Sequence, residues 1–106
     1  MTTYRISPEQ EHQLDIDRRN GLARYLINQP SGKQRTFLKG IKSDSYRNDI
    51  KDRMRDELAK NIAAMDTNVR NLRLYELSQH RKQSFFKDIL SRVNALIEQE
   101  VPHEST

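Results

Sequence analysis

The sequence contains no cysteine and no tryptophan, and it has only three glycines and three prolines. Without cysteine, the chain can form neither a disulfide framework nor a thiolate nucleophile, which fits a reducing compartment. No apolar run approaches the length of a membrane span. The first residues also lack the apolar segment of a signal peptide. We therefore expect a cytoplasmic protein that does not act within a membrane.

Apolar side chains are scarce as well. They make up 34% of the 106 residues, whereas charged side chains make up 32%. Leu, Ile, Val and Phe together number 24, just above the level of roughly 20% at which disorder is expected. A net charge of +4 is too small for self-repulsion to unfold the chain. We expect one folded domain over 1–106, with flexible ends at 1–6 and 103–106 and a thin core that a partner or a second copy could complete.

Glycine and proline are missing altogether from the 61 residues between Ile41 and Val101. Within this stretch, apolar residues first recur every three or four positions over 45–77, which predicts one amphipathic helix. This stripe consists of Ile50, Met54, Leu58, Ile62, Met65, Val69 and Leu72. Asp66-Thr67-Asn68 is a possible break, but the stripe crosses it without a change of phase. Ser43, Asp44 and Ser45 are candidate caps for its first turn.

A second apolar stripe follows a fully polar segment at 78–83 and predicts another helix over 84–101. It consists of Phe85, Phe86, Ile89, Leu90, Val93, Leu96 and Ile97. The polar segment favours a helical hairpin. The alternative is a continuous coiled coil, because both stripes share a heptad register, but three consecutive seam positions, Glu76, Gln79 and Gln83, are polar. The predicted fold is therefore all-α, with short N-terminal helices packed on a long helical hairpin (45–77 and 84–101).

The first N-terminal helix has recognisable signals at both ends. Ser7, Pro8 and Gln10 form the pattern of a capping box with proline in the first turn. Asn20-Gly21 could supply a left-handed cap after a helix over 8–19, although a helix could also continue through this glycine at a cost of about 1 kcal/mol.

Two further short helices are expected before Ile41. The first covers 22–28 and is followed by a loop at 29–32. The second covers 33–39 and ends at Gly40, with Phe37 and Leu38 facing inward.

A basic window lies between Asp17 and Asp44, where no acidic residue occurs. Its seven bases are Arg18, Arg19, Arg24, Lys33, Arg35, Lys39 and Lys42. Such a patch can contact phosphates, but it can equally face solvent or an acidic partner protein. We expect Tyr25 and Phe37, which lie between the bases, to belong to the core rather than to stack on nucleotides.

The apolar face of 84–101 is the widest in the chain, and two interpretations of it stay open. It can be the face of a central core helix, or part of it can bind a partner groove or a second copy. The candidate residues for partner contact are Phe85, Phe86, Ile89 and Leu96.

No pattern predicts catalysis. His12, His80 and His103 are far apart in the sequence, with no ligand spacing for a metal. The carboxylates of 44–57 alternate with bases, as on a solvated helix face. We expect no enzyme activity, no cofactor and no small-molecule substrate. The favoured function is a small helical protein-binding module, which could be an adaptor, an inhibitor or a self-associating regulator. The alternative is a nucleic-acid-binding regulator that uses the window 18–42.

Overall fold

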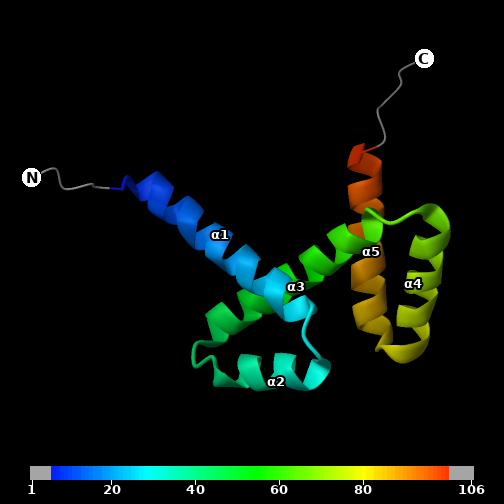
Figure 1. Ribbon diagram of the computed structural model, residues 1–106, viewed down its shortest axis with the longest axis horizontal. Coiled ribbons are helices and arrows are strands. Elements are labelled where there is room, and N and C mark those ends of the chain that lie inside the picture. Colours follow the sequence, from blue (N-terminus) through cyan, green and yellow to red (C-terminus); the bar gives the residue numbers. More distant parts are fainter. Residues whose placement is uncertain (1–5, 101–106) are drawn as a thin grey trace, which may run out of the picture. The chain divides into compact units, whose positions relative to one another are not determined.

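The computed structural model describes residues 6–100, which form five helices and no strand (Figure 1). The helices are α1 (Pro8–Ile27), α2 (Ser31–Gly40), α3 (Asp44–Ala63), α4 (Thr67–His80) and α5 (Gln83–Glu100). The predicted all-α class is confirmed. Apart from Ile6, the expected flexible ends at 1–6 and 103–106 lie outside the described residues.

The chain divides into two compact units, Met1–Met54 and Arg55–Thr106, with the boundary inside α3. The first unit contains α1, α2 and the beginning of α3. The second contains the end of α3, α4 and α5. The expectation that 1–106 is a single domain stays a prediction.

The predicted capping box starts α1. The backbone N–H of Gln10 donates to Oγ of Ser7 over 3.2 Å, and the backbone N–H of Ser7 donates to Oε1 of Gln10 over 3.0 Å. Pro8 occupies the first helical position, where its missing N–H costs no hydrogen bond. The local sequence therefore determines where this helix begins.

The predicted helix end at Asn20-Gly21 is wrong. The two expected helices, 8–19 and 22–28, are one helix, and no glycine among the described residues has a positive φ. A glycine inside a helix costs only about 1 kcal/mol. Burial of Ala23 and Leu26, one turn further on, outweighs that cost because each buried side chain contributes a comparable or larger amount.

The first turns of α2 and α3 differ in how they are capped. α2 begins at Ser31, two residues before the expected start, and Pro30 precedes it with no side-chain cap. At α3, Oγ of Ser43 accepts the backbone N–H of Tyr46 over 3.2 Å, which confirms one of the three expected caps. Ile50 in α3 is fully buried together with Ala23 and Leu26 of α1.

The predicted helix over 45–77 is interrupted at 64–66, so two helices, α3 and α4, stand in its place. Arg70 lies at this break. Its Nη2 donates to the carbonyl oxygens of Ala63 over 2.8 Å and of Met65 over 3.1 Å. These contacts satisfy carbonyls that have no intrahelical partner at the end of α3, and a cation there complements the helix dipole. The break excludes the continuous coiled coil.

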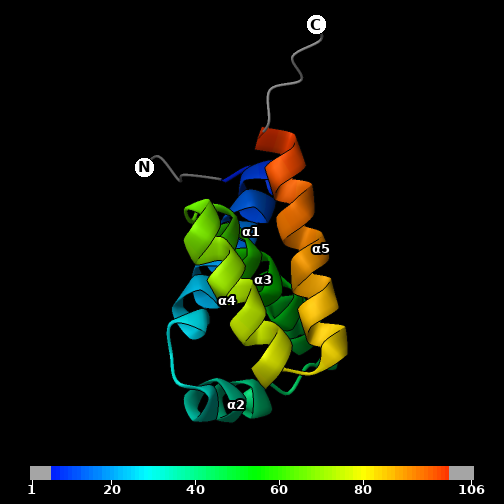
Figure 2. The same ribbon diagram turned by 90° about the vertical axis from the view of Figure 1, so that its right-hand side faces the viewer.

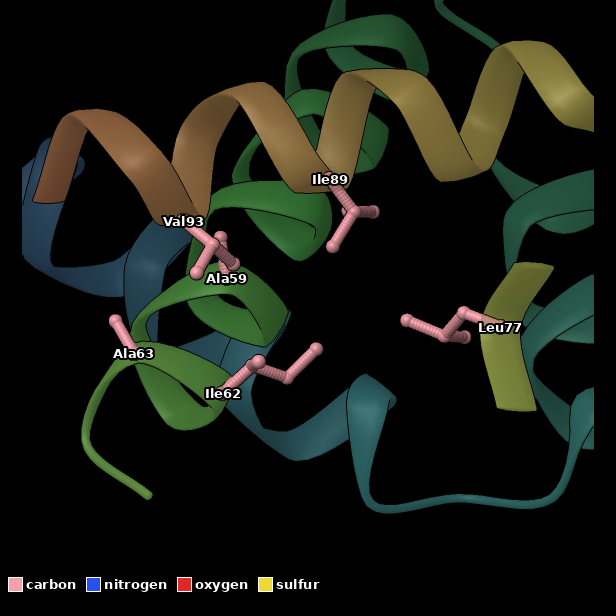
Figure 3. Close-up of a cluster of buried hydrophobic side chains, with 6 residues drawn as sticks. All are labelled: Ala59, Ile62, Ala63, Leu77, Ile89 and Val93. Atoms are coloured by element: carbon pink, nitrogen blue, oxygen red, sulfur yellow. The ribbon is translucent and has the colours of Figure 1, made fainter. Parts of the chain in front are cut away.

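α4 and α5 lie side by side in the second unit as an antiparallel hairpin, visible in both ribbon views (Figure 2). The connection is shorter than the expected 78–83, because α4 extends to His80 and α5 starts at Gln83. Figure 3 shows side chains from three helices pointing into one core. They are Ala59, Ile62 and Ala63 of α3, Leu77 of α4, and Ile89 and Val93 of α5.

The break also changes which face of α4 is buried. Val69 and Leu72, expected on the buried stripe, are 51% and 59% exposed. Leu77 is buried and Leu74 packs against the same core. The predicted stripe therefore fails beyond the break, because a new helix need not keep the phase of the previous one.

Gly21→Ala should stabilise the protein by about 0.5–1 kcal/mol, since alanine loses less conformational entropy in a helix interior. A β-carbon at Gly21 would meet nothing within 4 Å. Urea unfolding followed by helical circular dichroism measures the change. A loss of stability would instead indicate a left-handed cap at Gly21 and contradict a continuous α1.

Arg70→Ala should lower the free energy of unfolding by about 1–3 kcal/mol, because it removes two charge-assisted hydrogen bonds at the end of α3. Arg73→Ala is the matched control, since Arg73 forms only an exposed pair with Glu76 at 3.2 Å. Such a surface pair contributes no more than about 1 kcal/mol. Equal effects of the two substitutions in urea unfolding would show that Arg70 does not hold the break.

Candidate functional site

Asp49 is the centre of a charged network in the first unit. One of its carboxylate oxygens, Oδ2, accepts Nη1 of Arg19 over 2.8 Å and Nε of Arg53 over 2.9 Å. Nη1 of Arg53 also donates to Oδ1 of Asn20 over 2.7 Å. The guanidinium of Arg19 lies 4.8 Å from the ring centre of Tyr46. These contacts join the middle of α1 to the first half of α3.

The pKa of Asp49 lies below its ordinary value. The hydrogen bond from Arg19 is the largest cause and the bond from Arg53 the next, and together they outweigh the desolvation that acts in the opposite direction. The same contact with Asp49 raises the pKa of Arg19. Arg19 is therefore occupied by an internal ion pair rather than presented to a ligand.

The basic window thus separates into structural and surface residues. Arg19 is half-buried in the Asp49 network. Nε of Arg24 donates to the carbonyl oxygen of Asn20 over 3.3 Å. Arg24 is nevertheless exposed, as are the other five bases, Arg18, Lys33, Arg35, Lys39 and Lys42. Of the seven bases, only Arg19 is not exposed, and contact of the window with a ligand stays a prediction.

α2 carries its bases on two sides. At 100° per residue, Lys33 lies about 40° from Phe37 around the helix, whereas Arg35 and Lys39 lie about 160° from it. Within residues 6–100, no ion pair is formed by Lys33, Arg35 or Lys39. One side of α2 is therefore a cationic stripe, Arg35 and Lys39, and another side combines Lys33 with an aromatic ring.

The aromatic side of α2 borders a hollow of about 350 Å³ between the end of α1 and the start of α2. The hollow is lined by Tyr25, Leu26, Gln29, Gly32, Lys33, Thr36 and Phe37. The expectation that Tyr25 and Phe37 belong to the core is wrong, since they are 58% and 42% exposed. The buried side chains here are Ala23 and Leu26 of α1, and α2 has no buried residue. The two rings therefore remain exposed.

The apolar side of α5 is mainly core. Ile89 has no exposed surface, and Phe85, Phe86 and Leu96 pack partly buried against the same cluster. Ile89 can therefore contact no partner while the unit is folded. Partner contact by Phe85, Phe86 and Leu96 stays a prediction.

Phe85 is further covered by two guanidinium groups. Arg55 and Arg81 lie 5.1 Å and 4.7 Å from its ring centre. Arg55 also donates to Asp88 over 2.9 Å, and Nε of Arg92 donates to the same carboxylate over 3.2 Å. The bond from Arg55 is the main reason why the pKa of Asp88 is lowered. This arrangement links α5 to α3 within the second unit and covers part of the Phe85 ring.

An exposed apolar face on α4 was not predicted. Val69, Leu72 and Tyr75 are 51%, 59% and 62% exposed, and their three-residue spacing places them within an arc of about 120° centred on Leu72. Leu74 and Leu77, which face the core, lie about 140–160° from Leu72. The signal in the sequence was the change of phase at Leu74 and Leu77, which shows that α4 is apolar on two opposite sides.

Two classes of site are not found among residues 6–100. This part of the chain holds no group of three or more His, Asp or Glu side chains arranged to bind a metal ion. None of its helices combines the length and the hydropathy of a membrane span. Comparisons with protein-family models, with curated proteins and with solved structures found no match for this chain.

Acid should weaken the Asp49 network. Because the folded-state pKa of Asp49 is lowered, its ion pairs stabilise the protein above the ordinary aspartate pKa of about 3.9 and are lost as the pH falls through the folded value. Asp49→Asn should therefore destabilise the protein near neutral pH and make little difference in strong acid.

Urea unfolding of both proteins across this pH range measures the effect. Asp17→Asn is the control, because the exposed Asp17 carboxylate accepts only a hydrogen bond from Gln13 at 3.0 Å. A stability difference between Asp49→Asn and the natural protein that persisted unchanged in acid would contradict the role of the Asp49 charge.

Proposed function

We propose that this chain is a small, non-enzymatic protein-binding module, and that the partner it binds through α4 is a second copy of itself. The observation that carries the proposal is the exposed face of Val69, Leu72 and Tyr75. Apolar residues are scarce in this protein. Exposing three large apolar side chains on one helix face is unfavourable unless another surface covers them.

The spacing of this face is self-complementary. Val69 and Tyr75 are equally distant from Leu72 in sequence. Two antiparallel copies of α4, related by a two-fold axis at Leu72, would place Leu72 against Leu72 and Val69 against Tyr75. The nearest charged side chains, Arg73 and Glu76, already form a pair at 3.2 Å, so like charges need not meet across the axis.

The contact would be weak. Three side chains on a helix of 14 residues bury much less than the roughly 1,200–2,000 Å² of a stable interface. A micromolar or weaker dimer fits a self-associating regulator better than a permanent adaptor. We place it in the cytoplasm, because a chain without cysteine needs no oxidising compartment to reach its fold.

Charge at Leu72 provides the test. Leu72→Glu and Leu72→Lys should each be monomeric with unchanged helicity, because like charges would meet at the two-fold axis. A mixture of the two variants should form a heterodimer, since opposite charges then face each other. Sedimentation equilibrium from micromolar to millimolar concentration measures the association.

Leu14→Glu is the matched control, since Leu14 is an exposed leucine (40%) on α1 and its charge should leave the dimer intact. The proposal is wrong if the natural protein stays monomeric at all concentrations. It is also wrong if Leu14→Glu disrupts association as strongly as Leu72→Glu.

A second candidate function, a nucleic-acid-binding regulator, is favoured by a separate observation. Lys33, Arg35 and Lys39 are exposed on one short helix without an acidic residue, and the exposed rings of Tyr25 and Phe37 line the same hollow as Lys33. Bases that neutralise phosphates release counterions, and exposed rings can stack on nucleobases. This function would use the first unit, whereas α4 belongs to the second.

A further inference from the structure

We propose that the hollow between α1 and α2 binds single-stranded nucleic acid, with a nucleobase held against Tyr25 and Phe37. The inference rests on the second candidate function and names its site and its ligand class. The two rings come from different helices, yet they line the same hollow and both are substantially exposed. They therefore offer two aromatic surfaces to one ligand.

The shape of the hollow suits a flat, partly polar group. Its volume of about 350 Å³ lies at the lower end of the range for ligand sites. Gly32 forms part of the lining, and a β-carbon there would meet nothing within 4 Å, so a ligand can approach the backbone closely. The side-chain amide of the half-buried Gln29 offers donors and an acceptor for a base edge.

Charge complementarity identifies the ligand as an anionic chain. Lys33 lines the hollow and can meet a phosphate next to the bound base. Arg35 and Lys39 lie on the other side of α2, within the helix diameter of about 10–12 Å, where they can follow the strand as it leaves. Each nucleotide of a single strand carries a flat base and a phosphate. Such a ligand matches a hollow that has two aromatic rings and is surrounded by cationic side chains.

A duplex fits this site less well than a single strand. In a duplex the base faces are stacked on their neighbours and cannot reach aromatic side chains, whereas an unpaired base can be inserted. The geometry therefore predicts a preference for single strands, in addition to the salt-dependent attraction that any polyanion would experience.

Fluorescence anisotropy with a labelled, mixed-sequence single strand of about 16 nucleotides tests the inference. Tyr25→Ala and Phe37→Ala should each weaken binding by about 5- to 150-fold, the loss expected for one stacked base. Tyr25→Phe and Phe37→Tyr retain the rings and should bind like the natural protein. Circular dichroism of every variant checks that the helices are retained.

Gly32→Leu gives an independent test that does not remove a ring. The side chain should fill the hollow and weaken binding to the strand, whereas Gly40→Leu, at the other end of α2 and outside the hollow, should not. The double variant Arg35→Glu/Lys39→Glu should weaken strand and duplex alike. It should also reduce the slope of log affinity against log salt by about 1.4, the value for two phosphate contacts with a single strand.

Three outcomes would overturn the inference, and they have different meanings. If neither strand nor duplex binds at low salt, the nucleic-acid function itself fails. If both bind equally and Tyr25→Ala, Phe37→Ala and Gly32→Leu have no effect, that function stands but the hollow is not its site. If polyglutamate of matched charge displaces the strand as well as unlabelled strand does, the window binds acidic protein instead.

Discussion

The contact on which the second unit depends is the cap that Arg70 places on the end of α3. Its guanidinium holds the carbonyls of Ala63 and Met65 in a stretch that has neither glycine nor proline to end a helix. A single helix from 44 to 101 would extend about 87 Å and could bury little of its own apolar surface. Because the chain turns at 64–66, residues from α3, α4 and α5 can share one core.

Because the core is thin, charged networks help to position α1 against α3 in the first unit and α5 against α3 in the second. The first unit buries only Ala23, Leu26 and Ile50 among its described residues, and Asp49 connects α1 to α3 beside them. In the second unit Asp88 has the corresponding role, since it accepts hydrogen bonds from α3 and from its own helix. Both carboxylates are paired with two guanidinium groups, so each helix contact is fixed by directional bonds as well as by burial.

Local signals in the sequence were sufficient for the fold class and for the capping box at Ser7, and they narrowed the cap of α3 to three residues that include Ser43. They failed where tertiary contacts decide. Asp66-Thr67-Asn68 signals a possible break, but the apolar stripe that crosses it in phase favoured one helix. The break at 64–66 is stabilised by Arg70, and arginine in a helix carries no signal for a turn. Gly21 carries a stop signal that burial further along α1 overrides. The aromatic hollow was missed because hydrophobicity predicted burial for Tyr25 and Phe37, whereas their exposure depends on how the end of α1 and the start of α2 are arranged.

The two surfaces proposed for binding follow from the same shortage of apolar residues. With more apolar residues, the chain could form a core large enough to cover both apolar faces of α4 and to enclose Tyr25 and Phe37. Here α4 has apolar residues on two opposite sides, and only the side with Leu74 and Leu77 is covered by the chain itself. The α4 face and the hollow share no residue, so a substitution at one removes no side chain of the other. The proposed self-association and the proposed strand binding can therefore be tested with separate sets of variants.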